Sequence, residues 1–513
     1  MRVYEKSTQR LISHPQELKD IDVSIIGSGP SGAALAHRIQ EHERADLRIA
    51  VIECGDVKAL QHVNNLLPNS ARRSLIDYFG HRPWEGDLEG GWLVSGLGGR
   101  GIVAGAHLRR MDAVDFTLWK EGKWPPPVIE ALTNELYDSA ERDRRVSTPR
   151  LRGSAQAEIA ERLKAEGAYP PPIGVDLSPT VGFSISAGYD SSAATLWREL
   201  LVDCAKHHST GSPRRFFLST ETYAVRVLVR GSSAVGIVAY DPEGREVVLP
   251  SRIVVLAASP IESARLALNS GLNNGLGAVG SWLAEHTERR AKIRVECAGG
   301  AGDGVSLVLP PPDKHLDQRY QIHLRGEPDP ASDRHLVIDI GGFAAVDPRP
   351  ENRVTLSGTA VDRFGVPKAH TRFSLSENDK RRAAALEARI REVAAMIGGT
   401  FITRQFPSEG INPQYSGNDE AIQMMPLGRS YHEAGTLRMG TDLQTSVTDH
   451  VGKIHGIDNV YVSDASLFPS VGIANPMLTI TALAYRVGDA IVHALSGHRD
   501  CDTDRPWSSR ECA

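Results

Sequence analysis

Residues 22–39 read DVSIIGSGPSGAALAHRI, and residues 48–55 read RIAVIECG. Both stretches contain an apolar run typical of a buried strand, and a helical pattern follows the first, so residues 20–60 predict a βαβ unit with a parallel sheet. Gly27, Gly29 and Gly32 stand between strand and helix. The first glycine permits a tight turn, the second lets backbone amides approach a pyrophosphate, and the third allows close packing. The pattern predicts a dinucleotide site at the start of the helix.

An acidic residue ends the second predicted strand. Glu53 lies where a carboxylate can accept hydrogen bonds from an adenosine ribose, and Ser31 belongs to the same predicted site. A carboxylate here disfavours a 2'-phosphate, which leaves FAD or NAD as the dinucleotide. The alternative is a glycine turn with a structural role alone.

The bulk composition is that of a soluble protein that acts on small molecules. The chain has 513 residues, 41% hydrophobic and 24% charged residues, and a net charge of -5, without the basic surplus that nucleic-acid binding requires. Its five cysteines have no metal-binding or redox spacing, so we expect free thiols and no metal site. The first 15 residues lack a signal-peptide core, which favours a cytoplasmic location.

Strand and helix signals change character along the chain. Residues 217–257 predict three strands, and Ser259, Pro260 and Glu262 predict the capped start of a helix that ends near Gly271. HLVIDIGGFAAV, NRVTLSG and TRFSLS predict strands of an antiparallel sheet. The chain therefore combines a parallel and an antiparallel sheet.

Two further helices are expected after these strands. Ser376 and Asp379 predict a capping box, and an apolar face follows that consists of Leu386, Ile390, Val393 and Ile397; the helix should end at Gly398. The uncharged run from Leu467 to Tyr485 is interrupted by prolines, so it predicts a buried loop and a buried helix rather than a membrane span.

Five motifs resemble the glucose-methanol-choline (GMC) family of FAD-dependent oxidoreductases. They are GLGGRGIVAGAHLRRMDAVDF at 96–116, IVVLAASPIESARLALNSG at 253–271, GSWLAEH at 280–286, YHEAGTLRMG at 431–440 and VYVSDASLFPSVGIANPMLTITALA at 460–484. NRVTLSGTAVDRFGVP at 352–367 looks most like the branch that oxidises sugars and polyols.

The resemblance implies an α/β protein, α+β overall, in which a substrate domain is inserted into a Rossmann-type FAD-binding domain. We expect the FAD-binding domain to comprise residues 1–120, 215–285 and 440–513. The substrate-binding domain, an antiparallel sheet backed by helices, should comprise residues 121–214 and 286–439.

The resemblance places the catalytic pair at His432 and Asn475. Oxidation of an alcohol to a carbonyl removes a hydroxyl proton and passes a hydride to flavin N5, so it needs a base with a pKa near neutrality, which histidine provides. The Asn475 amide would hold the hydroxyl oxygen and stabilise its developing charge. Asn475 also precedes Pro476, a good first helical residue, so it could simply cap the helix at about 476–495. That helix would direct its positive end at the flavin.

Other residues match the family's cofactor-binding segments. Val103 occupies the place of the histidine that tethers FAD in some relatives, so we expect dissociable FAD, and His107 is expected to be structural. Ala104 replaces a common asparagine. The further candidates are Gly98, Gly99, Val225 beside adenine, and Asp464 with Ala465 along the pyrophosphate and ribitol.

Several functional alternatives stay open on the residues alone. A lyase with a redox-silent FAD would use the same base, and a silent dinucleotide-binding module or a nicotinamide dehydrogenase would share the glycine turn. Glu433 could attract a cationic group such as an amino sugar, or be an ordinary loop carboxylate. The sequence leaves open the substrate hydroxyl, the oligomeric state and whether oxygen or another acceptor takes the electrons.

Overall fold

The glycine turn follows the central strand of a seven-stranded sheet. Its order is β8-β2-β1-β11-β10-β9, with β20 beside β11. β1 pairs in parallel with β2 and with β11, as the βαβ pattern predicts. The strands are β1 Ile21–Ile26, β2 Ile49–Ile52, β8 Phe216–Ser219, β9 Tyr223–Arg230, β10 Ser233–Tyr240, β11 Glu246–Leu256 and β20 Val460–Val462.

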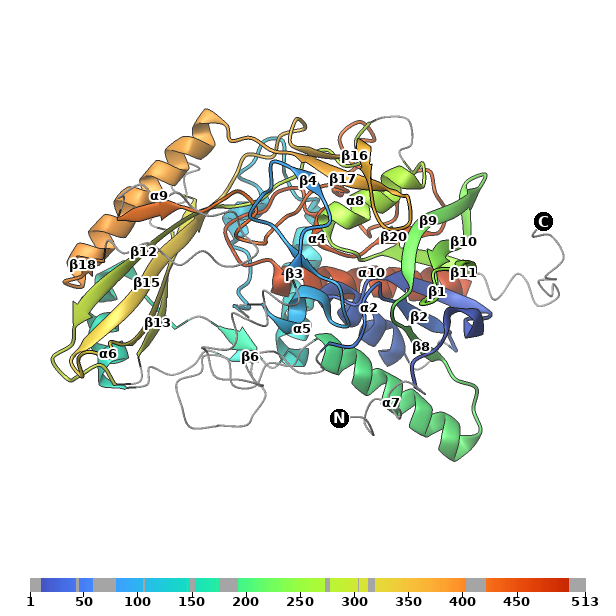
Figure 1. The fold of residues 1–513 in the computed structure, drawn as a ribbon, viewed down its shortest axis with the longest axis horizontal. Helices are drawn as coiled ribbons and strands as arrows, with labels where there is room; N and C mark the ends of the chain where they lie inside the picture. The colour runs from blue at the N-terminus through green and yellow to red at the C-terminus, as the bar shows by residue number, and fades with distance from the viewer. Residues whose placement is uncertain are drawn as a thin grey trace.

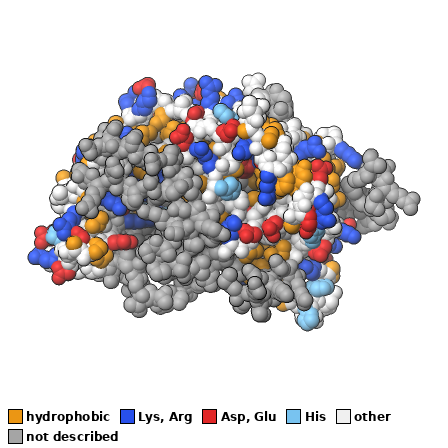
Figure 2. Space-filling model, in the orientation of Figure 1, with side chains coloured by type: hydrophobic (Ala, Val, Ile, Leu, Met, Phe, Trp, Pro, Cys, Tyr) orange, Lys and Arg blue, Asp and Glu red, His pale blue; other side chains and the backbone are white. Residues whose placement is uncertain are grey.

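The computed structural model describes most of the chain. The described residues are 11–42, 46–58, 80–104, 107–144, 146–147, 153–170, 172–174, 192–272, 277–302, 304–311, 319–402 and 421–497. Residues 1–10 and 498–513, which include Cys501 and Cys512, lie outside the described residues. Cys54, Cys204 and Cys297 are free thiols. Figure 2 shows acidic and basic side chains interspersed on the described part of one face.

Helices cover the first sheet at one end of the molecule (Figure 1). α2, Pro30–Glu41, packs against α10, Met477–Gly497, and α7, Ser192–Thr210. α10 is long and apolar enough to cross a membrane, but 61% of its apolar window is buried inside the protein. Because α10 packs on α2 and on α5, Tyr137–Asp143, a core helix explains its composition, as the sequence predicts.

The second sheet has six antiparallel strands and lies at the opposite end of the molecule (Figure 1). Its order is β13-β14-β15-β12-β18, with β19 beside β12. The strands are β12 Thr287–Glu296, β13 Val305–Leu309, β14 Tyr320–Pro328, β15 His335–Ala344, β18 Thr400–Phe401 and β19 Ile422–Met424. Its core face is covered by α9, Glu377–Met396, and by α6, Ser154–Arg162.

α9 confirms the predicted helix in detail. Ser376 and Asp379 form the capping box, and the predicted apolar face is fully buried. Gly398 follows the helix with φ 70°, a backbone conformation that glycine adopts without strain. The local sequence therefore sets both ends of this helix.

Two local predictions are wrong. TRFSLS contributes Thr371 and Arg372 alone to a strand, β17 Pro367–Arg372, and this strand pairs with β16 Arg353–Val361 and β4 Glu85–Gly86 in a separate sheet. α8 spans Pro260–Asn269 as expected, but Ser259 has φ 79° and makes no capping bond within the described residues. Ser259 lines the cavity described below.

The remaining elements are short. They are β3 Gly80–His81, β5 Leu93–Val94, β6 Val146–Ser147, β7 Ile173–Gly174, α4 Pro126–Ala131, the π-helix η5 Leu132–Leu136 and the 3-10 helices η1 Pro15–Glu17, η3 Gly99–Ile102, η4 Ala113–Phe116, η6 Lys164–Glu166 and η8 Ala465–Leu467.

The two sheets divide the chain much as the expected domains do. All strands of the first sheet come from segments assigned to the FAD-binding domain, and all strands of the second come from segments assigned to the substrate domain. α7, within the segment 121–214, packs against α2 and β8 of the first sheet. The domain limits themselves stay a prediction.

A buried ion pair joins η4 to the start of β14. Arg319 and Asp115 are 1% and 0% exposed, and their closest N–O distance is 2.6 Å. We predict that Arg319→Met lowers the free energy of unfolding by about 3–5 kcal/mol, because it leaves a buried carboxylate unpaired. Chemical denaturation measures this. Arg334→Met, which breaks an exposed pair with Glu296, should cost less than about 1 kcal/mol, and equal losses in both variants would contradict the prediction.

Candidate functional site

The glycine turn has the shape that a pyrophosphate requires. Gly27 has φ 109°, and a Cβ on Gly32 would lie 2.0 Å from the Gly27 carbonyl oxygen, so both positions exclude larger residues. A Cβ on Gly29 would meet no described atom within 4 Å, because Gly29 borders an open cavity. Since α2 begins at Pro30, its N-terminal amides face this space. The turn therefore fits a dinucleotide.

Glu53 lies at the end of β2 and is 5% exposed. Its Oε2 accepts a hydrogen bond from the Ser28 hydroxyl, and its Oε1 accepts one from the Gly55 amide at 2.9 Å. Burial raises the pKa of this carboxyl, whereas the hydrogen bonds from Ser28 and Gly55 oppose that effect. The carboxyl group is thus held rigidly at the cavity wall, in the position predicted for a ribose acceptor.

Nearly all the predicted site residues line one cavity of about 710 Å³. It is lined by Gly27, Gly29, Ser31, Glu53, Gly99, Val103, Ala104, Val225, Asp464, Ala465 and Pro476 and by both predicted catalytic residues, His432 and Asn475. Gly32 and Gly98 do not line it. Gly32 packs on Gly27, and Gly98 packs on Ala193.

The predicted catalytic pair is close together. The Asn475 Nδ2 and His432 Nε2 atoms are 3.3 Å apart, although 43 residues separate them along the chain. Gln321 on β14 donates to the Asn475 Oδ1 at 3.4 Å, and Arg109 donates to the Gln321 Oε1 at 2.6 Å. Because its oxygen is an acceptor here, Asn475 presents its NH₂ group to the imidazole.

A second histidine determines which nitrogen of His432 carries the proton. His286 Nε2 lies 2.9 Å from the Gly472 carbonyl oxygen, which can only accept, so Nε2 is the protonated nitrogen. His286 Nδ1 then accepts from His432 Nδ1 at 2.8 Å. This assignment leaves His432 Nε2 unprotonated, so its lone pair accepts from Asn475 and faces the cavity.

Burial keeps both imidazoles neutral. It lowers the pKa of His286 to about 4 and is the main cause that lowers the pKa of His432 well below its usual value. The rings of Phe343 and His286 lie 5.0 Å from that of His432, between centroids. The expected base near neutrality is therefore a weaker base in the free protein, since packed rings replace the water that would solvate an imidazolium.

The loop that carries His432 is strained and firmly anchored. Tyr431 has φ 60°, a left-handed conformation that is unfavourable for a large side chain. Glu285, fully buried, accepts hydrogen bonds from the Ser430 hydroxyl and from the His432 amide. Burial and the nearby Glu433 raise the pKa of Glu285 well above its usual value. Such strain persists where surrounding contacts impose it, often at functional sites.

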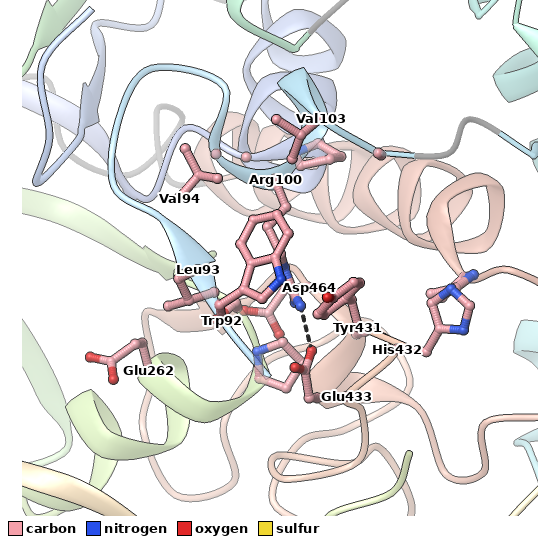
Figure 3. A pocket seen from close by; sticks show the side chains of 18 of the residues that line it. Trp92, Leu93, Val94, Arg100, Val103, Glu262, Tyr431, His432, Glu433 and Asp464 are labelled. Carbon is pink, nitrogen blue, oxygen red and sulfur yellow. Dashed lines mark ion pairs between the residues drawn. The ribbon is translucent and has the colours of Figure 1, made fainter. Parts of the chain in front are cut away.

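Glu433 already forms an ion pair within the chain. Its side chain is 1% exposed, and its Oε2 lies 2.7 Å from Arg100 Nη1. Figure 3 shows this ion pair next to the rings of Trp92 and Tyr431. The carboxylate that was a candidate for amino-sugar recognition is therefore already paired within the chain.

The structure also places three other residues that the sequence analysis singled out. Val103 is buried at the cavity wall, and its apolar side chain offers no nucleophile for a bond to a flavin. His107 stacks on His323, with ring centroids 5.0 Å apart, and also borders the cavity. Asp464 lines the cavity as well, and it also caps η8 by accepting from the Ser466 amide.

Glu285, His286 and His432 are also close enough together to bind a metal ion. The lone pairs of the two imidazoles are engaged, however, in the hydrogen bonds from His432 and Asn475 described above. The arrangement therefore suits proton transfer better than metal ligation.

Sequence reasoning missed four residues of this site, namely Arg100, Glu285, His286 and Gln321. Glu285 and His286 end the motif GSWLAEH, and Arg100 lies inside the glycine motif at 96–116, so the family motifs contained a signal for three of them. Gln321 has no local signal, because its contact with Asn475 depends on how β14 approaches the distant loop.

Comparison with known proteins identifies the chain's relatives. Residues 348–484 match the family model for GMC oxidoreductase. The C-glycoside 3-oxidase of Microbacterium trichothecenolyticum is 26% identical, over 91% of this chain and 95% of that protein. The paromamine 6'-oxidase of Streptomyces fradiae is 28% identical, over 92% of this chain and 91% of that protein.

Solved structures confirm the predicted fold class. Pyridoxine 4-oxidase from Mesorbium loti superposes with a TM-score of 0.66 and 15% identity, covering 92% of this chain and 99% of that chain. The formate oxidase of Aspergillus oryzae superposes with a TM-score of 0.65 and 15% identity, covering 94% of this chain and 99% of that chain. The motifs, the cavity and these matches agree: residues 348–484 match the GMC oxidoreductases, a family of FAD-dependent enzymes that oxidise alcohols, and the chain is similar to sugar and aminoglycoside oxidases over nearly its whole length.

Proposed function

We propose that the protein oxidises a hydroxyl group of a sugar or amino sugar to a carbonyl, with His432 as the base and dissociable FAD as the hydride acceptor. The observation that carries this proposal is the 3.3 Å approach of Asn475 Nδ2 to the unprotonated Nε2 of His432. Both atoms belong to residues that line the cavity containing the glycine turn. One alcohol oxygen can therefore reach both groups.

The two side chains perform complementary tasks. A substrate hydroxyl donates its proton toward His432 Nε2 while its oxygen accepts a hydrogen bond from Asn475 Nδ2, replacing the bond between the two residues. As the proton moves, the Asn475 amide stabilises the charge that develops on oxygen. FAD, when bound, supplies the acceptor for the hydride. His286 Nδ1 continues to accept from His432 Nδ1 and so holds the ring in place.

The substrate side of the cavity is polar. Arg325 on β14 lies directly opposite Asp339 on β15, and Arg290 on β12 contacts Glu288 at 2.5 Å; all four line the cavity. Hydrogen bonds to charged groups contribute about 1.5–3 kcal/mol each, so hydroxyl-rich rings gain from this wall. An apolar alcohol would remove water from these groups and return no hydrogen bonds. Asp339 also offers an acceptor to an ammonium group.

The relatives support the same substrate class. The names of the C-glycoside 3-oxidase and the paromamine 6'-oxidase describe oxidation of glycoside and aminoglycoside positions. We extend that class, but not a particular position, to this chain. Oxygen is one electron acceptor to test, beside artificial acceptors.

Anaerobic mixing of the yellow protein with glucose, paromamine and 1-butanol tests the proposed function. We expect a sugar to bleach the flavin and 1-butanol to do so at least about tenfold more slowly, because only the sugar replaces the hydrogen bonds of the polar wall. His432→Ala should slow bleaching by about 10²–10⁴-fold while FAD stays bound. His370→Ala, an exposed histidine, is the matched control. Turnover without bleaching would indicate the lyase, and bleaching at the wild-type rate in His432→Ala would contradict the assigned base.

The pH dependence of kcat/KM follows from the state of His432. The base acts when unprotonated, and burial holds its pKa well below 6.5, so it is already neutral above that pH. We expect kcat/KM to be constant between about pH 6.5 and 8 and to fall only at lower pH, as the imidazole gains a proton. An acid limb centred at or above pH 7 would contradict this.

FAD should separate from the protein on denaturation. Since Val103 occupies the tethering position, acid precipitation followed by centrifugation should leave the yellow colour in the supernatant. Val103→His offers the comparison, because it adds a nucleophile at that position. Colour that stays with the precipitated wild-type protein would mean a covalent bond elsewhere.

A further inference from the structure

The ion pair between Arg100 and Glu433 has unusual surroundings for a charged pair. Glu433 is 1% exposed, and Arg100 is 19% exposed. The contact of 2.7 Å is close but poorly aligned, so neither carboxylate oxygen of Glu433 nor Arg100 Nη1 makes a hydrogen bond within the described chain. Buried polar atoms normally have such partners, and exceptions require an explanation.

The pair connects the two halves of the site. Arg100 belongs to η3, whose first residue, Gly99, lies against Gly29 of the glycine turn; a Cβ on Gly99 would be 3.2 Å from the Gly29 Cα. Glu433 follows the proposed base directly in sequence. Both charged residues line the same cavity as His432, which in Figure 3 lies apart from the ion pair.

Stability alone does not explain this pair. A buried ion pair is often no more stabilising than a well-packed apolar pair, because both charges lose their hydration. Its charge does, however, reach the reaction centre: after burial and His286, Arg100 is the next cause that lowers the pKa of His432. Arg100 also lines the cavity that fits FAD, so its charge would act on a flavin bound there.

We propose that Arg100 and Glu433 set the reduction potential of the flavin: the guanidinium stabilises the charge of the reduced ring, and the carboxylate holds the guanidinium in place and offsets most of its charge. This inference rests on the FAD site of the proposed function. Transfer of a hydride brings two electrons and one proton to N5, so the ring gains one negative charge unless a second proton follows. A net positive charge nearby therefore favours the reduced form.

The sign of each substitution follows from the net charge of the pair. Glu433→Gln changes that charge from zero to +1, so it should raise the midpoint potential. Arg100→Met changes it to -1, so it should lower the potential. The double variant, Arg100→Met with Glu433→Gln, restores a net charge of zero. Its equilibrium constant between oxidised and reduced flavin should therefore be within about twofold of the wild-type value.

The experiment is a redox titration of each FAD-bound protein with xanthine oxidase and a reference dye, which needs no alcohol substrate. We expect Glu433→Gln to shift the equilibrium toward reduced flavin by about tenfold or more, which is about 30 mV for a two-electron couple. Arg100→Met should shift it the other way. Because no turnover is measured, failure of the proposed alcohol oxidation would leave this result interpretable.

Matched controls separate the charge effect from a structural one. Asp347→Asn removes a carboxylate from the buried pair with Arg382, away from the cavity, and should leave the potential unchanged even if the protein is less stable. Glu433→Asp keeps the charge of the pair and should leave the midpoint potential of the flavin close to the wild-type value. Single variants that both retain the wild-type potential, or that both shift it in the same direction, would overturn the proposal.

Discussion

The hydrogen bond between two buried imidazoles, His286 Nδ1 and His432 Nδ1 at 2.8 Å, is the interaction on which the site depends. The Gly472 carbonyl fixes the proton of His286, which fixes the proton of His432 and exposes the Nε2 lone pair. Without this relay the ring could turn its protonated nitrogen to the cavity, where it could not accept a proton. The same buried setting lowers the pKa of both rings, so the relay consists of neutral groups.

The fold supplies this relay from distant parts of the chain. β12 begins directly after His286, β14 supplies Gln321 to orient Asn475, and α10 follows Asn475 and packs on α2 of the glycine turn. The base is therefore placed by the second sheet, whereas the cofactor turn is placed by the first. An enzyme that brings alcohol and FAD together needs both, and the cavity lies where they meet.

Sequence reasoning predicted the parts that local chemistry determines. The glycine turn, the α9 capping box and the apolar strands follow from conformation and periodicity at single segments, and the structure confirms them. The TRFSLS strand and the Ser259 cap failed because tertiary pairing and a positive φ overrode local preference. The closeness of His432 and Asn475 came from family motifs, and their roles stay a prediction. The contacts of Gln321, Arg100 and Glu433 could not be predicted, since each depends on packing between distant loops.

Nuclear magnetic resonance of protein labelled with ¹⁵N-histidine measures the central claim most directly, because the two ring nitrogens have distinct shifts when protonated and unprotonated. The His432 signals can be assigned by their absence from the His432→Ala spectrum. We predict a protonated Nδ1 and an unprotonated Nε2 for His432 at pH 7. A protonated Nε2 at that pH would contradict the account, since such a ring could not accept the hydroxyl proton of an alcohol.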